Sequence, residues 1–193
     1  VIIKSSGANV DTLIGIENIT GTSGNDTIFG DSGAKTLISG AGNDILEGGA
    51  GDDFIDGGAD IDTVFYNQAT SGVNVNLGTT ALQNVGGGQG NDTLIDIENV
   101  IGSGFADTFK GNNSVSNTFN GGMNLSTQVE NLNDENDTVD YSTLTGVTDK
   151  IIVDLSNTIS ANIQVTVAGV AQGADTLINI ENVIGGAGND TFT

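Results

Sequence analysis

The sequence predicts an all-β fold in which the chain coils as a parallel β-solenoid. Two observations lead to this prediction: a nine-residue repeat of glycine and aspartate with one apolar residue per copy, and the absence of a convincing long helical pattern. The composition agrees, because the 193 residues include 30 Gly and only 5% aromatic residues, which is low for a conventional globular core. Stacked short strands need only a thin core.

Five nonapeptides follow one another without a gap from residue 21 to residue 65: GTSGNDTIF, GDSGAKTLI, SGAGNDILE, GGAGDDFID and GGADIDTVF. Glycine at the second and fourth positions favours a tight turn with positive φ and a close approach of backbone carbonyls to a ligand. The last three residues of each copy are expected to form a short strand whose central apolar side chain points inward. One such side chain cannot bury itself alone, so the coils must stack to be stable.

The sixth position of the repeat carries an acidic residue in four of the five copies. Two nonapeptides make one coil, so we expect Asp26, Asp44 and Asp62 to stack on one edge, and Lys35 and Asp53 on the other. At the spacing of about 4.8 Å between strands, two like charges repel by about 1 kcal/mol even in water. Carboxylates and turn carbonyls are the oxygen ligands that calcium prefers. The sequence therefore predicts several calcium ions along the edges; the alternative is that these Asp side chains only form Asx turns.

The repeat resembles that of RTX (repeats-in-toxin, hemolysin-type) calcium-binding proteins, whose unit is GGxGxDxUx with U apolar; residues 48–56 match every defined position. The resemblance implies a β-roll, a parallel solenoid with calcium ions between stacked GGxGxD loops. Besides the four sixth-position Asp residues, it places in the metal sites Gly24, Asn25, Gly40, Gly42, Asn43, Gly49, Gly51, Asp52, Asp60, Asp107, Asp137, Gly186, Gly188 and Asp190.

A longer period overlies the first. DTLIGIENIT begins at Asp11, DTLIDIENVI at Asp92 and DTLINIENVI at Asp175, and the related segments DTVFY and DTVDY begin at Asp62 and Asp137. We therefore expect three RTX modules, at residues 1–61, 62–136 and 137–193, the second more degenerate and the third incomplete. Strands are expected at residues 73–77 and 151–155, and a polar, acidic insertion at residues 122–136.

The order of these elements is similar to that in the β-roll region of serralysin-type secreted proteases. In that family the Glu of the IEN element and the Asp of the preceding DT element help to hold calcium. The resemblance therefore pairs Glu98 with the loop at Asp62, and Glu181 with the loop at Asp137. Glu17 would match a partner upstream. The alternative is that Ile-Glu-Asn forms a turn with Glu in solvent.

Lys35 stands where a ligand Asp is expected, so the edge that holds Asp53 should have a weaker or missing site. Its ammonium group would either bridge neighbouring carboxylates or extend into solvent. In the second module Asn117 replaces Asp and Asp107 follows a poor glycine pattern, GSGFAD, so we expect fewer ions there.

Composition excludes several function classes. The net charge of -21 argues against nucleic acids and anionic membranes as partners. There is no His for an HExxH zinc helix, no Cys, no Gly-x-Ser-x-Gly elbow and no run of 18 apolar residues. The carboxylates have repeating surroundings, whereas a catalytic pair needs two different ones. We expect a chain that is not an enzyme.

The prediction is a segment of a secreted or cell-surface bacterial repeat protein with a structural or adhesive role, as in a surface layer, an adhesin or a matrix filament. The alternative is a C-terminal folding and secretion module of a type I-secreted protease, lipase or epimerase. Folding should follow extracellular calcium, since such modules commonly bind at about 10⁻⁴ to 10⁻³ M. Because the sequence begins and stops within a module, a longer array and assembly with other copies are expected. Polysaccharide binding has no aromatic platform to support it.

Overall fold

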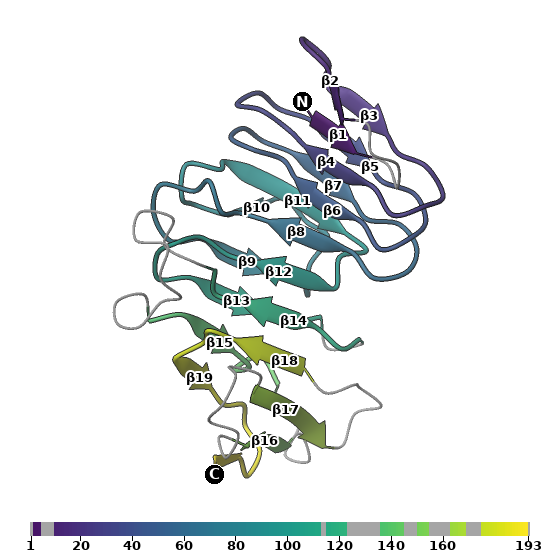
Figure 1. Cartoon of the computed structure of the whole chain (residues 1–193). Helices are drawn as coiled ribbons and strands as arrows, with labels where there is room; N and C mark the ends of the chain where they lie inside the picture. The colour runs from purple at the N-terminus through teal and green to yellow at the C-terminus, as the bar shows by residue number, and fades with distance from the viewer. Residues whose placement is uncertain are drawn as a thin grey trace.

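The computed structural model describes residues 2–4, 10–112, 115–122, 136–144, 150–154, 163–168 and 175–192. Every regular element in these segments is a β-strand, so the predicted all-β fold is confirmed. The coils form an elongated stack, with β1–β3 at one end and β16–β20 at the other (Figure 1). None of the described residues belongs to a helix long and apolar enough to cross a membrane.

The strands of the nonapeptides are short because six of the nine residues form the turn and only three are left for the strand. Their bounds are β1 (Ile2–Lys4), β2 (Val10–Thr12), β3 (Asn18–Thr20), β4 (Thr27–Phe29), β5 (Thr36–Ile38), β6 (Ile45–Glu47), β7 (Phe54–Asp56), β8 (Thr63–Phe65), β9 (Asn74–Asn76), β10 (Gln83–Asn84), β11 (Asn91–Ile95), β12 (Asn99–Ile101), β13 (Thr108–Lys110), β14 (Thr118–Asn120), β15 (Thr138–Asp140), β16 (Lys150–Asp154), β17 (Ile163–Ala168), β18 (Asp175–Ile178), β19 (Asn182–Ile184) and β20 (Thr191–Phe192).

One face of the stack is a single sheet that runs through the whole molecule, in the order β2-β1-β4-β6-β8-β12-β14-β18-β17-β16-β20. From β4 to β18 its strands are parallel and in register, so that Ile28 lies beside Leu46, and Leu46 beside Val64. Antiparallel pairings occur at the two ends, where β1 pairs with β4 and β17 with β18. The predicted parallel stacking of coils 18 residues apart is thus confirmed for the nonapeptides.

The opposite face is divided into two shorter sheets, β10-β11-β7-β5-β3 and β19-β15-β13-β9. After β8 the chain starts the second of these with β9, and then returns through an antiparallel β10–β11 pair that places β11 beside β7. The excursion at residues 62–92 therefore interrupts one face and leaves the other continuous. The strands expected at residues 73–77 and 151–155 correspond to β9 and β16; most of the insertion expected at residues 122–136 lies outside the described residues.

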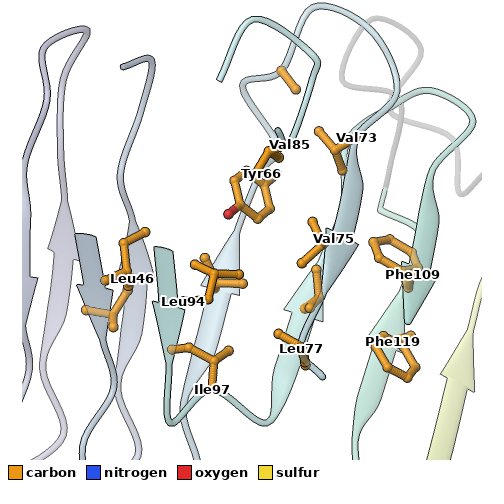
Figure 2. Close-up of a cluster of buried hydrophobic side chains, with 14 of the residues drawn as sticks. Leu46, Tyr66, Val73, Val75, Leu77, Val85, Leu94, Ile97, Phe109 and Phe119 are labelled. Carbon is orange, nitrogen blue, oxygen red and sulfur yellow. The ribbon is translucent and has the colours of Figure 1, made fainter. Parts of the chain in front are cut away.

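The core is a narrow row of apolar side chains between the two faces (Figure 2). The central residue of nearly every described strand from β3 to β15 is buried, and Phe109 and Phe119 stack with ring centroids 5.7 Å apart. Tyr66 is also fully enclosed. Each such side chain stabilises the fold by about 1.5–3 kcal/mol, so stability accumulates coil by coil.

Candidate metal centre in the stacked loops

The loop glycines have the conformation that the repeat predicts. Gly40, Gly42, Gly49 and Gly51 have φ between 92° and 125°, which L side chains rarely adopt. A Cβ atom on Gly49 would overlap the backbone carbonyl of Asp31 in the preceding coil. Glycine at these positions therefore allows consecutive loops to touch through their backbones.

The sixth-position side chains form hydrogen-bonded ladders along both edges. In each step one carboxylate oxygen accepts a hydrogen bond from the backbone N–H of the equivalent residue one coil earlier. On the first edge the donor–acceptor pairs are Asp26 N to Asp44 Oδ1 at 2.7 Å, Asp44 N to Asp62 Oδ1 at 2.8 Å, and Asp62 N to Glu98 Oε2 at 3.0 Å. On the second edge they are Lys35 N to Asp53 Oδ1 at 2.7 Å and Asp53 N to Asp92 Oδ1 at 3.1 Å. The predicted stacking of these residues is confirmed.

Ladders of the same kind continue toward the C-terminal end. Their pairs are Val73 N to Asp107 Oδ1 at 2.7 Å, Asp107 N to Asp137 Oδ1 at 2.7 Å, Asp137 N to Glu181 Oε2 at 2.8 Å, and Asn117 N to Asp175 Oδ1 at 2.8 Å. One side-chain contact thus recurs on both edges and along most of the described stack.

One carboxylate oxygen of several of these residues is buried and accepts no hydrogen bond from any described residue. These oxygens include Oδ1 of Asp26 and Oδ2 of Asp44, of Asp53 and of Asp62. Burial raises the pKa of Asp53 to about 6 and that of Asp62 to about 7, and neighbouring carboxylates push both in the same direction. An unpartnered, desolvated carboxylate is stable at neutral pH only beside a cation.

The first glycine of each of these loops lets the carboxylate lie close to the backbone. A Cβ atom on Gly48 or Gly57 would overlap the carboxylate of Asp53 or Asp62. No three Asp, Glu, His or Cys side chains converge on one point in the described part of the chain. A hard cation would thus need one or two carboxylates with backbone carbonyls of the glycine turns, a donor set that calcium accepts.

Comparison with known proteins agrees with this donor set. The family model described as the RTX calcium-binding nonapeptide repeat matches the chain in four copies, at residues 7–34, 36–64 and 179–193. The chain carries RTX repeats. No curated protein matches it. Repeats of this family bind calcium and are typically found in secreted proteins, and the parallel strands of this chain are consistent with a β-roll built from such repeats.

The polar residues next to the sixth position form an outer ladder on the RTX loops. Asn25 Oδ1 accepts from Asn43 N at 3.0 Å, Asn43 Oδ1 from Ile61 N at 3.3 Å, Asp60 Oδ2 from Gly42 N at 3.1 Å, and Asp52 Oδ1 from Asn91 N at 2.9 Å. The four side chains that carry these acceptor oxygens are exposed. Asp60 also takes the place of the fourth-position glycine with φ 82°.

Not every predicted loop has the same backbone. Gly24 lacks the positive φ of its counterparts Gly42 and Gly51, and so do Gly186 and Gly188 in the last repeat. Asp190, in that repeat, is half-buried, whereas Asp44 and Asp53 are fully buried. The consensus GGAGND at residues 185–190 therefore does not by itself produce the open turn seen at residues 48–53.

The structure brings together both acidic pairs that the serralysin resemblance implies. Glu98 bonds to the backbone of Asp62, and Glu181 to that of Asp137, as described above. Each Glu N–H in turn donates to the same Asp carbonyl, at 3.2 Å in both cases. Glu17 is exposed, and its carbonyl accepts a hydrogen bond from Thr36 N.

Two ladder carboxylates were missed by the sequence prediction: Asp92 and Asp175. Asp92 closes the loop GGQGND at residues 87–92, which matches the GGxGxD consensus and was a readable signal. Asp175 has no such glycine pattern before it. Tyr66 and Tyr141 are buried, and their hydroxyls donate to Asp92 Oδ2 at 3.0 Å and to Asp175 Oδ2 at 2.8 Å.

Lys35 does not extend into solvent. Its side chain is 3% exposed and its ammonium group contacts Asp31 Oδ1 and Gly33 O, both in its own loop. The interaction with a carboxylate is therefore made within the loop, while Asp53 of the next coil bonds to the backbone N–H of Lys35.

Proposed function

We propose that the chain is a non-catalytic, calcium-folded segment of a secreted bacterial repeat protein with a structural or adhesive role, as in a surface layer, an adhesin or a matrix filament. The observation that carries the calcium dependence is that sixth-position carboxylates have buried oxygens without a hydrogen-bond partner, on Asp26, Asp44, Asp53 and Asp62. Without a cation these groups oppose folding at neutral pH.

On this proposal calcium lies between successive loops, held by the sixth-position carboxylates and by turn carbonyls. Asp44, Asp53 and Asp62 are the principal ligands, and Glu98 completes the first ladder. The remaining predicted ligands, including Asp26, Asp107, Asp137, Glu181 and Asp190, belong to further candidate sites along the same ladders. Bound calcium supplies positive charge that the four Lys residues are too few to provide.

The modular division at residues 62 and 137 belongs to the same proposal. Its support is a set of contacts that recurs after both boundaries: Tyr66 N donates to Ile101 O and Tyr141 N to Ile184 O, each at 2.9 Å. Because a module repeats its internal contacts, further copies could stack on an uncovered end coil, which is the basis for a filament or layer.

The second candidate, a folding and secretion module of a type I-secreted enzyme, is favoured by the order of the DT, IEN and GGxGxD elements, which is that of serralysin-type proteases. Both candidates require folding on calcium. They differ in what adjoins the chain in the full-length protein: a catalytic domain supports the second, and further modules of the same kind support the first.

The decisive experiment is far-UV circular dichroism during a calcium titration, with magnesium and EGTA as controls. The expected result is a cooperative gain of β signal near millimolar calcium and none with magnesium. A chain that is fully β-rich in EGTA at neutral pH would show that the unpartnered carboxylates do not control folding, and would remove the proposed calcium dependence.

A further inference from the structure

The loops of the roll show three arrangements, according to what contacts the sixth-position side chain. In the loops at residues 39–44, 48–53 and 57–62, Gly occupies the second position and the second and fourth residues have φ between 82° and 125°. Oδ2 of the Asp is buried without a partner in all three. We call these the open loops.

In three other loops the second position holds a polar side chain that contacts the sixth residue. Thr22 Oγ1 and N donate to Asp26 Oδ2 at 2.9 and 2.6 Å, but Asp26 Oδ1 is buried without a hydrogen-bond partner, so this carboxylate is closed on one oxygen only. Ser103 Oγ donates to Asp107 Oδ1 at 2.7 Å, and Ser103 N to Asp107 Oδ2 at 2.6 Å. Asp31 makes the reciprocal pair, accepting from the Lys35 ammonium. None of these three second-position residues has a positive φ. We call these the self-closed loops.

The loop at residues 87–92 forms a third arrangement. It has Gly at the second and fourth positions with φ 79° and 92°, as the open loops do. Its Asp92 Oδ2 is nevertheless occupied, because the buried hydroxyl of Tyr66 donates to it. Tyr141 makes the same contact with Asp175. The hydroxyl reaches the loop from the segment that follows β8 and not from the loop itself.

We propose that these donors stand in for calcium: Lys35 and Ser103 within their own loops, and Tyr66 and Tyr141 from outside, close their loops to the ion, so that calcium binds only where the Asp keeps a buried oxygen without a donor, as in the open loops. The inference rests on the proposed function, since it decides which carboxylates of the same ladder take part. The GGxGxD consensus alone does not decide it, because GGQGND matches the consensus and is closed.

The physical reason is that a buried carboxylate oxygen needs either a hydrogen-bond donor or a cation. A donor on the same chain is present at any calcium concentration. Where Oδ2 already has such a donor, an incoming ion must displace it before it can bind. Where Oδ2 has none, as in Asp44, the ion meets no competitor.

The test counts calcium ions bound per chain, by equilibrium dialysis of the full 193-residue chain, and compares matched variants. Ser103→Gly removes the closing hydroxyl and restores the consensus residue, so we expect one additional ion. Thr22→Gly is the control and should leave the count unchanged, because Asp26 already has a buried oxygen without a partner. Asp44→Asn tests the proposed function and should lower the count by one ion. The Tyr66→Phe variant keeps the proposal testable if Ser103→Gly does not fold in calcium.

Tyr66→Phe tests closure from outside the loop and should also add one ion, at Asp92. If the count in Ser103→Gly and Tyr66→Phe equals that of the unmodified chain while Asp44→Asn lowers it, the closures are refuted and the proposed function stands. If the unmodified chain binds no calcium, the proposed function itself fails. A gain in only one type of variant refutes the closure that the other type was built to open.

Discussion

The second-position glycine of an open loop meets two demands that no other residue meets together. Gly49 has φ 92°, and a Cβ atom there would overlap the carbonyl oxygen of Asp31 in the adjacent coil. The first demand is conformational and costs about 1–2 kcal/mol in an L residue. The second is steric and involves backbone, which cannot move without separating the two coils.

A substitution pair separates these two demands. Gly49→Ala should lower the free energy of unfolding by about 2–4 kcal/mol, because strain and overlap add. Gly15→Ala is the matched control: Gly15 also has positive φ, 67°, but a Cβ atom there meets nothing within 4 Å. It should cost only about 1 kcal/mol. Urea unfolding in saturating calcium measures both, and equal losses would show that the overlap is relieved without cost.

Residue types and spacing were enough to predict which carboxylates align, because a strict nine-residue period leaves one register for the coils. They were not enough to predict which carboxylates are closed. The contact between Tyr66 and Asp92 joins residues from different coils, and neither sequence segment shows by itself that the two side chains meet. The contacts of Thr22 and Ser103 were easier to predict, because both residues stand four positions before their Asp and replace a glycine of the consensus.

Among the strands, one inward side chain per nonapeptide carries the packing. Leu46 in β6 is 0% exposed, whereas its neighbour Ile45 faces outward and is 38% exposed. Because the core is only one residue deep, a cavity left by truncation has few neighbours that can collapse into it.

Leu46→Ala should therefore destabilise the folded chain by about 2–5 kcal/mol, the range for buried leucine truncation. Ile45→Ala, one residue away in the same strand, should cost less than about 1 kcal/mol. Chemical denaturation in saturating calcium gives both values. A larger loss in Ile45→Ala than in Leu46→Ala would mean that the outward face of β6 is covered in solution.

The period predicted β4 to β8 closely, since local pattern and tertiary stacking coincide there. It did not predict the route of residues 62–92, where β9 begins a second sheet and β11 returns to β7. Leu94 in β11 pairs with Ile55 in β7, and these segments come from different parts of the sequence. The entropy cost of closing the loop between them cannot be read from either segment alone. The GGQGND motif marked where the chain rejoins the ladder, and with it the return could have been placed.

At the scale of the whole molecule, charge dominates. The chain has 25 acidic residues against 4 basic ones. Of the basic residues, Lys35 forms an ion pair with Asp31 in its own loop, and Lys110 Nζ lies 2.9 Å from Asp140 Oδ2. The stacked ladders therefore depend on a cation from solution or on protons, and these two must compete for the same oxygens.

Acid should accordingly replace part of the effect of calcium. Burial raises the pKa of Asp62 and Asp92 to about 7 and that of Asp53 to about 6, from an ordinary value of 3.8. Since the folded chain holds these protons more tightly than the unfolded chain, their contribution to stability is complete below about pH 4 and is lost as the pH rises through 6 to 7. In EGTA, circular dichroism should show more β structure at pH 5 than at pH 7.5.

With calcium the pH dependence of folding reverses, because protons then displace the ion. The midpoint of the calcium titration should therefore move to a higher calcium concentration at pH 5. A β signal in EGTA that falls on acidification would mean that repulsion among these carboxylates is not what holds the calcium-free chain open.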